Sequence, residues 1–185
     1  MDGNNKYDAE KFGKQDAKKG IKFIKFPNVL IIQLKRFEYD YKRDQMIKIN
    51  DHFEFYKELD LNKYTCKQEI DGNEIDNTEF NYTLQSVVVH QGSASRGHYY
   101  SYLNPTTNDK NWLLFNDEIV RPANLYEVYD YNFGGIKSCI SIKPGGKLVE
   151  YYVNSDANAY ILVYIKNSVR EEIMKQVLEE DVSNY

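Results

Sequence analysis

The chain has 185 residues, of which 42% are hydrophobic and 28% charged, as in soluble globular proteins. Its net charge of −4 comes from intermixed lysines and carboxylates, without the basic stripe expected for nucleic-acid binding. No apolar run reaches the length of a membrane span, and residues 1–15 lack the apolar core of a signal peptide. We therefore expect no nucleic-acid partner, no membrane partner, and a location in the nucleus or the cytoplasm.

The N-terminal part of the chain contains one strong strand signal. Residues 5–20 are polar, and Asp8 and Gly20 could bound a short helix there, although the apolar positions are sparse. Residues 28–37, "NVLIIQLKRF", are almost continuously apolar before their basic pair, which predicts a strand buried on both faces. A charged loop then leads into a second strand at 46–49.

The following part of the chain alternates strand and turn signals. Strands are expected at 82–90, 98–103, 112–122 and 159–166, the third of them broken at Asn116-Asp117. A small-residue loop, 91–97, and a turn rich in Asn, Pro and Asp, 104–111, separate the first three. Residues 123–158 are mixed, with glycine-rich breakers. The pattern predicts a meandering, largely antiparallel sheet with few helices.

The C-terminal tail changes its hydrophobic period. Ser168 and Glu171 match a capping box, and Val169, Ile173 and Val177 recur every four residues. The sequence therefore predicts an amphipathic helix over 168–181.

His98 is the candidate for chemistry, because it starts a strand directly after Gly97. We expect Gly97 to remove a side chain that would otherwise crowd the imidazole. In an antiparallel pair joined by the 104–111 turn, the start of the first strand lies opposite the end of the second, so Asn116 and Asp117 should come within reach of His98. An oxygen that accepts one ring N–H fixes the tautomer and leaves the other nitrogen basic. The alternative is a structural histidine at a strand edge.

The sequence offers no convincing nucleophile for this base. Cys139 stands in an apolar strand-like context, where a thiol is usually inert, and Cys66 stands in a polar stretch without a helix start to lower its pKa. Ser93 and Ser95 are too near His98 in sequence to form a triad with it. The three histidines show no metal-ligand spacing, so we expect no metal.

Four stretches in this order carry a family resemblance: "FPNVLIIQLKRFEYD", "VVVHQGSASRGHYYSYL", "WLLFNDEIV" and "NAYILVYIK". Together they resemble the C-terminal half of a ubiquitin-specific protease catalytic domain, with the herpesvirus-associated subfamily most similar. The resemblance covers residues 2–167. It implies an α+β, β-rich, papain-like cysteine protease fold, here the palm and part of the fingers. Residues 168–185 would then be a C-terminal helix leading out of the domain.

The resemblance also implies roles for particular residues. His98 corresponds to the general base, Asn116 to the third member of the triad, and Asp117 to an acidic residue that assists. Phe37 and Tyr99 resemble residues that line the channel for the ubiquitin tail, with His90 nearby. The implied reaction is hydrolysis of the (iso)peptide bond at the C-terminal glycine of ubiquitin. The implied partners are ubiquitin, ubiquitinated proteins and an upstream thumb half of the same protein.

Two departures from the family pattern shape these expectations. The Asn- and Gly-rich cysteine box is missing from the chain, so we expect this segment to be inactive alone. The fingers stretch reads "NKYDAEKFGK", with Ala9 and Phe12 where zinc-binding cysteines would stand, so no zinc or other cofactor is implied. That resemblance also favours an extended segment over a helix at 8–19. Two alternatives stay open: a non-catalytic ubiquitin-binding or scaffold module, and a β-rich adaptor in which His98 is structural.

Overall fold

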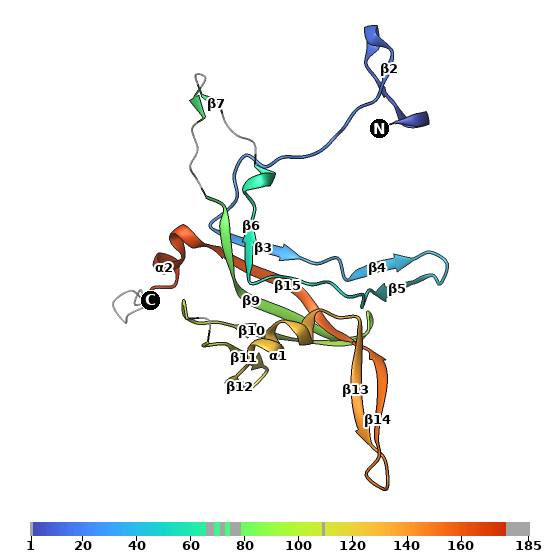
Figure 1. Cartoon of the computed structure of the whole chain (residues 1–185), viewed down its shortest axis with the longest axis vertical. Coiled ribbons are helices and arrows are strands. Elements are labelled where there is room, and N and C mark those ends of the chain that lie inside the picture. The colour runs from blue at the N-terminus through green and yellow to red at the C-terminus, as the bar shows by residue number, and fades with distance from the viewer. Residues whose placement is uncertain (1, 66–68, 71–72, 75–78, 109, 177–185) are drawn as a thin grey trace.

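The computed structural model describes residues 2–65, 69–70, 73–74, 79–108 and 110–176. Its body is a seven-stranded sheet whose main path runs β12-β11-β10-β9-β15-β3, with β6 paired to the start of β9 (Figure 1). Every neighbouring pair in this sheet is antiparallel, which confirms the predicted sheet type. The strands are β3 (Val29–Gln33), β6 (Glu58–Asp60), β9 (Asn81–Gly92), β10 (Gly97–Leu103), β11 (Leu113–Asn116), β12 (Ile119–Pro122) and β15 (Ala157–Lys166).

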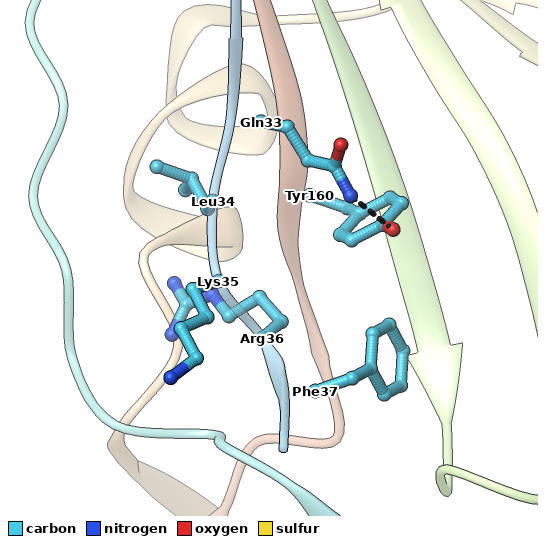
Figure 2. A pocket seen from close by; sticks show the side chains of 6 residues that line it. All are labelled: Gln33, Leu34, Lys35, Arg36, Phe37 and Tyr160. Carbon is cyan, nitrogen blue, oxygen red and sulfur yellow. Dashed lines mark hydrogen bonds between the residues drawn. The ribbon is translucent and has the colours of Figure 1, made fainter.

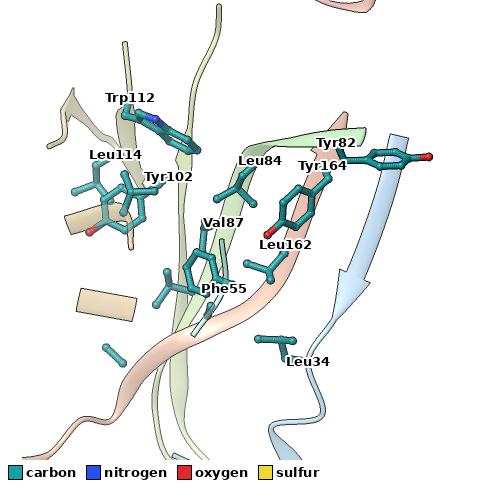
Figure 3. Packing of buried hydrophobic residues seen from close by; sticks show 14 of the residues in the cluster. Leu34, Phe55, Tyr82, Leu84, Val87, Tyr102, Trp112, Leu114, Leu162 and Tyr164 are labelled. Atoms are coloured by element: carbon teal, nitrogen blue, oxygen red, sulfur yellow. The ribbon is translucent and has the colours of Figure 1, made fainter. Parts of the chain in front are cut away.

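The two long strands β9 and β15 form the centre of the sheet, because their Val, Leu, Ile and Tyr side chains suit a buried pleated surface. Tyr82 and Tyr164 are fully buried there, and each hydroxyl donates to a backbone carbonyl, of Pro27 at 2.6 Å and of Tyr56 at 2.7 Å. The high tyrosine content thus supplies apolar bulk without leaving a hydroxyl unpaired. The core packed around these strands also includes Leu34, Phe55, Leu84, Val87, Tyr102, Trp112, Leu114 and Leu162 (Figure 3).

The strand predicted at 28–37 is shorter and less buried than expected. β3 ends at Gln33 and lies at the edge of the sheet, where Leu30 and Ile32 pack on the core while Val29 and Ile31 are exposed. The apolar run has the composition of a central strand, but the face that carries Val29 and Ile31 is exposed. The prediction of burial on both faces was therefore wrong.

The described residues also form four two-stranded hairpins outside the sheet. Residues 8–19 contain no α-helix, which agrees with the extended segment that the resemblance implied, although a 3-10 turn at Glu10–Phe12 interrupts it. The hairpins are β1 (Tyr7–Asp8) with β2 (Lys14–Gln15), β4 (Phe37–Asp40) with β5 (Gln45–Lys48), β7 (Glu69–Ile70) with β8 (Asn73–Glu74), and β13 (Ile136–Ile142) with β14 (Leu148–Asn154). The last of these extends away from the sheet (Figure 1) and was not anticipated within 123–158.

The expected break at Asn116-Asp117 is a reversal of direction, not an interruption of one strand. β11 ends at Asn116 and pairs with β12, whose first residue, Ile119, lies opposite Asn116. Asp117 occupies the turn with φ of 51°, a left-handed conformation that aspartate tolerates better than most residues. The polar pair therefore marks a tight turn at the edge of the sheet.

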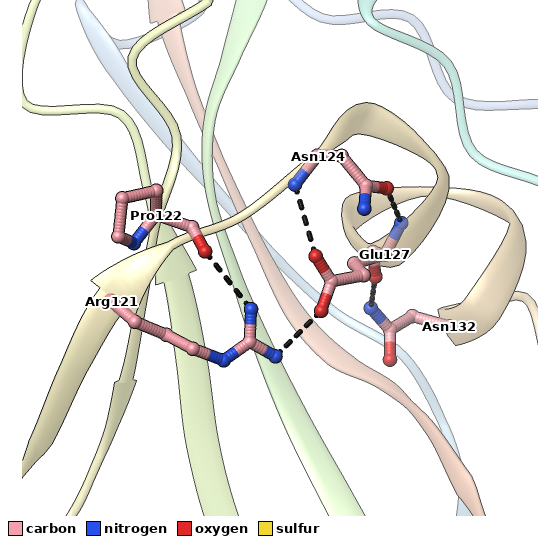
Figure 4. A network of polar contacts seen from close by, with 5 residues as sticks. All are labelled: Arg121, Pro122, Asn124, Glu127 and Asn132. Carbon is pink, nitrogen blue, oxygen red and sulfur yellow. Dashed lines mark hydrogen bonds and ion pairs between the residues drawn. The ribbon is translucent and has the colours of Figure 1, made fainter.

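A short helix, α1 (Leu125–Val128), closes the end of β12 (Figure 4). Its capping box is complete: Asn124 Oδ1 accepts from the Glu127 amide, and Glu127 Oε2 accepts from the Asn124 amide, both at 3.0 Å. Arg121 donates to Glu127 Oε1 at 2.6 Å, which lowers the pKa of the Glu127 carboxyl. This network anchors the chain after the site strands, and Val128 is buried in the core.

The tail differs from the predicted helix in the residues described. A 3-10 turn, η5 (Asn167–Val169), precedes one α turn, α2 (Arg170–Ile173), which ends at Met174. Val169, not Ser168, is the N-cap residue, and no side chain caps the turn, so the predicted capping box was wrong. The rest of the predicted stretch beyond 176 lies outside the described residues.

The other 3-10 helices are η1 (Gly3–Asn5), η2 (Glu10–Phe12), η3 (Asn62–Tyr64) and η4 (Asp130–Asn132). None of the described helices is both long and apolar enough to cross a membrane.

Candidate active site

The β10–β11 hairpin brings His98 and Asn116 together. Ser101 pairs with Phe115 and Leu103 with Leu113, so the start of β10 runs alongside the end of β11. Nε2 of His98 lies 2.5 Å from Oδ1 of Asn116. The contact predicted from the pairing of the two strands is therefore present.

Asp117 adds a negative charge on the same side of the imidazole. Its Oδ2 lies 3.6 Å from Nε2 of His98, too far for a hydrogen bond. The Asp117 side chain is 76% exposed, so solvent weakens the electrostatic interaction between the two groups. The backbone of Asp117 is in the left-handed region at this turn. His98, Asn116 and Asp117 line an open depression together with Glu118 and Ile119.

This geometry defines the chemistry that His98 can perform. The carbonyl oxygen of Asn116 can only accept a hydrogen bond, so Nε2 of His98 carries the proton and donates it. The lone pair then resides on Nδ1, which becomes the basic atom. The His98 side chain remains 44% exposed, and the ring is stacked 6.3 Å from the ring of Tyr100. An oriented, accessible imidazole of this kind suits a general base.

The residues expected to line a substrate channel form an aromatic cluster beside the site. The ring of His90 lies between Phe37, with centroids 5.0 Å apart, and Tyr99, with centroids 4.7 Å apart. Tyr160 completes the cluster, at 5.5 Å from Phe37 and 5.7 Å from Tyr99. The Tyr160 hydroxyl accepts from Gln33 Nε2 at 2.6 Å, and Figure 2 shows Gln33, Phe37 and Tyr160 on one side of the β3–β4 segment.

The residues of this cluster differ in how far they are exposed to solvent. Tyr99 is 51% exposed, whereas His90 is only 4% exposed. His90 therefore lies beneath Phe37 and Tyr99 and supports them in this structure. Burial lowers the pKa of the His90 imidazole, with Lys48 lowering it further and Asp156 opposing the shift. Tyr160 and Gln33 were not identified from sequence, because ordinary strand alternation gives no sign that they face this cluster.

Gly97 has a different role from the one expected. A Cβ atom at this position would lie 2.0 Å from Nε2 of His90, so the glycine makes room for His90 and not for the imidazole of His98. Its φ is not in the left-handed region, so conformational freedom is not the reason for a glycine here. The expectation that Gly97 leaves space for an imidazole was correct, but the imidazole is that of His90 and not that of His98.

Two cations that sequence reasoning missed, the buried Arg36 and the half-buried Lys48, connect the neighbouring segments. Arg36 is 4% exposed and donates to the carbonyls of Ala159 at 3.2 Å, Asp51 at 2.6 Å and Phe133 at 3.3 Å. Burial lowers the pKa of Arg36, and the Asp51 carboxylate opposes this. Lys48 donates to carbonyls at the ends of β9 and β15. The signal was a basic residue between apolar neighbours, as in "LKRF" and "MIKIN".

No thiol in the described residues is assigned to this site. Cys139 is a free cysteine on β13, paired in register with Tyr151 of β14, on the hairpin that extends away from the sheet (Figure 1). Cys66 lies outside the described residues. Within the residues described, no group of three or more His, Cys, Asp or Glu side chains could hold a metal ion.

Comparison with known proteins identifies the class to which this sheet and site belong. The family model "Ubiquitin carboxyl-terminal hydrolase" matches residues 5–164. The chain therefore belongs to this family of deubiquitinases, and its mostly antiparallel sheet fits the papain-like α+β fold predicted from the resemblance.

Particular relatives and one solved structure agree with this assignment. Ubiquitin C-terminal hydrolase 12 of Arabidopsis thaliana is 43% identical over 100% of this chain, and ubiquitin carboxyl-terminal hydrolase 15 of Saccharomyces cerevisiae is 38% identical over 100% of it. The chain spans only 16% of the length of each. A structure of the SAGA Ubp8/Sgf11/Sus1/Sgf73 DUB module bound to ubiquitin aldehyde matches 89% of this chain and 30% of that chain, with a TM-score of 0.60 and 25% identity.

Proposed function

We propose that this chain supplies the general base and the orienting residue of a thiol-dependent deubiquitinase that cleaves after the C-terminal glycine of ubiquitin. The observation that carries the proposal is the 2.5 Å contact between Nε2 of His98 and Oδ1 of Asn116, in a chain of the ubiquitin carboxyl-terminal hydrolase family. A purely structural histidine would not need an imidazole that is 44% exposed in an open depression.

The nucleophile in this proposal is a cysteine of the same enzyme outside this chain. Nδ1 of His98 takes the thiol proton, and the thiolate attacks the glycine carbonyl to form a tetrahedral intermediate. The protonated imidazole then gives its proton to the departing amine, which leaves a thioester. A water molecule that His98 deprotonates attacks the thioester, releasing the ubiquitin carboxylate and returning the proton to the cysteine.

Asn116 and Asp117 divide the task of stabilising the positive ring. Asn116 is neutral and holds the ring orientation through one hydrogen bond. Asp117 supplies the charge that Asn116 lacks, at 3.6 Å and in contact with solvent. We therefore assign the larger catalytic effect to Asn116 and a smaller one to Asp117.

The aromatic cluster is the proposed channel for the ubiquitin tail. Phe37 and Tyr99 present ring surface beside the strand that carries His98, and His90 supports both rings. The solved structure with a TM-score of 0.60 was determined with ubiquitin aldehyde bound, which supports ubiquitin as the partner here. Ubiquitinated proteins are then the substrates, and the thumb half of the catalytic domain is the intramolecular partner.

The place of the chain within a longer enzyme is also part of the proposal. The match to 30% of the solved chain and to 16% of each of the two relatives supports a segment of a longer enzyme. We place this segment in the C-terminal half of the catalytic domain and expect it to be inactive alone, because it carries the base His98 but no assigned nucleophile. The family match ends at residue 164, close to the end of β15, which supports a boundary near 167 and a tail that leads out of the domain.

The test compares this chain with the complete enzyme on a fluorogenic conjugate of the ubiquitin C-terminus. The complete enzyme should release the fluorophore, and the 185-residue chain should not. If the complete enzyme binds ubiquitin but never turns over the conjugate, the segment is a non-catalytic ubiquitin-binding module instead.

A further inference from the structure

One row of residues across three strands fixes the position of His98. His98 on β10 pairs with Gln91 on β9, and Gln91 pairs on its other side with Ala157, the first residue of β15. This row lies at the corner of the sheet, because β9 ends at Gly92 and β15 begins at Ala157. Beyond this row the sheet has only one further β9–β10 pair, Gly97 with Gly92, and one hydrogen bond from the Gly92 amide to the Asp156 carbonyl at 3.1 Å. Few ladder hydrogen bonds therefore hold the corner, and a further support there would stabilise it.

Lys48 supplies hydrogen bonds on both sides of that row. Its Nζ donates to the carbonyl of His90 at 2.8 Å and to the carbonyl of Gly92 at 3.2 Å, the two neighbours of Gln91. It also donates at 2.5 Å to the carbonyl of Asp156, the neighbour of Ala157. One ammonium group thus joins the end of β9 to the start of β15, next to the pair partner of His98.

Lys48 reaches this corner from a separate element, the β4–β5 hairpin. It pairs in register with Phe37, whose ring packs on His90. One rung of this hairpin therefore contacts the corner twice, through an aromatic ring and through an ammonium group. The hairpin and the strand that carries His98 are thereby fixed relative to each other.

The placement of this charge is costly for stability. Burial lowers the pKa of Lys48 to about 8, while the Asp156 carboxylate raises it and the Arg36 guanidinium lowers it further. The ammonium is still the main form at pH 7, and its three N–H groups match three carbonyl acceptors. An uncharged side chain would avoid the cost but could not satisfy three acceptors at one point.

We propose that Lys48 is a positioning residue that holds the β9–β10 corner, and with it the His98 imidazole, in place for catalysis. The inference rests on the proposed function of His98 and adds a residue to it. Lys48 acts through the backbone on both sides of Gln91 and need not touch the substrate.

The test uses the complete enzyme with Lys48→Met, with Lys48→Gln as a second variant and Lys25→Met as a control at an exposed lysine. Hydrogen exchange is measured in peptides that cover 90–98 and, as an internal reference, 82–88. Lys48→Met should speed exchange at 90–98 by about tenfold or more without changing 82–88. It should lower kcat by roughly 10- to 100-fold, because a small displacement of a catalytic group strongly reduces the rate of the reaction. Lys48→Gln should show smaller changes in both, and Lys25→Met none.

The readouts separate the failure of this inference from failure of the proposed function. Unchanged exchange at 90–98 in both Lys48 variants would overturn the positioning role, whatever happens to turnover. Faster exchange at 82–88 as well would show a general structural role and would also overturn it. Faster exchange confined to 90–98 with unchanged kcat would show that catalysis does not depend on this corner, and it would also overturn the proposal. The proposed function itself fails if His98→Ala leaves turnover intact, or if the unaltered complete enzyme never turns over the conjugate.

Discussion

Gly97 and His90 are in such close contact that a Cβ atom on residue 97 would come within 2.0 Å of Nε2 of His90. This contact links two functional groups, because Gly97 precedes His98 and His90 supports the rings of Phe37 and Tyr99. A change at residue 97 should therefore affect both the base and the proposed tail channel.

Gly97→Ala should destabilise the protein by about 1–3 kcal/mol, the usual cost of overpacking a well-packed site. It should also lower turnover, because either the His90 ring or the start of β10 must move. Urea unfolding measures the first effect and steady-state kinetics the second. Gly20→Ala is the matched control, since nothing lies within 4 Å of a Cβ atom there, and it should leave both unchanged. A stable, fully active Gly97→Ala enzyme would contradict the close contact.

Asn116→Ala should lower kcat/KM by roughly 100-fold, because the imidazole loses the acceptor that fixes its tautomer and orientation. Asp117→Asn should cause a smaller loss, since its carboxylate is 3.6 Å away and exposed. The measurement is turnover of a fluorogenic ubiquitin conjugate, with ubiquitin affinity determined in parallel. A larger loss at Asp117 than at Asn116 would reverse the roles assigned to them.

Protein stability should depend on pH through His90. Burial lowers the pKa of His90 below its ordinary value of 6.5. Between the two pKa values, His90 is therefore protonated in the unfolded chain but neutral in the folded chain. The contribution of His90 to the free energy of unfolding is therefore complete above pH 6.5. It falls as the pH decreases from there toward the pKa in the folded state.

Urea unfolding between pH 5 and 8 measures this dependence. His90→Gln should flatten the loss of stability on the acid side, whereas His52→Gln, at an exposed histidine, should leave it unchanged. An unaltered pH dependence in His90→Gln would rule out His90 as its source.

The isolated chain should associate with itself. One face of the β13–β14 hairpin exposes four aliphatic side chains: Ile136 at 75%, Ile140 at 68%, Ile142 at 73% and Leu148 at 65%. Exposed apolar surface of this kind promotes association. Light scattering over a range of concentrations should show oligomers that Ile140→Thr with Ile142→Thr reduces. Ile21→Thr, at a similarly exposed position outside this hairpin, should change association less. A chain that is monomeric at every concentration would contradict this prediction.

The contact between His98 and Asn116 could be predicted because it depends on local pairing. A single turn joins β10 to β11, so the order of residues along the hairpin already places the two side chains. The capping box at α1 was equally local, yet the short Asn124-to-Glu127 pattern was not singled out within a mixed stretch.

Long-range packing explains what could not be predicted. The sequence of β3 does not reveal that it lies at the edge of the sheet, because its neighbour β15 is more than 120 residues away. Lys48 and Arg36 donate hydrogen bonds to backbone carbonyls of distant segments. Every residue has such a carbonyl, so the sequence does not show which ones these two side chains contact. The same holds for Gly97, whose requirement comes from His90 and not from its neighbour in sequence.

The most direct measurement is turnover of a fluorogenic ubiquitin conjugate by the complete enzyme carrying His98→Ala. We predict a loss of at least about 100-fold in kcat, with ubiquitin affinity and thermal stability close to those of the unaltered enzyme. An enzyme that keeps its turnover without the imidazole would contradict the assignment of His98 as the general base.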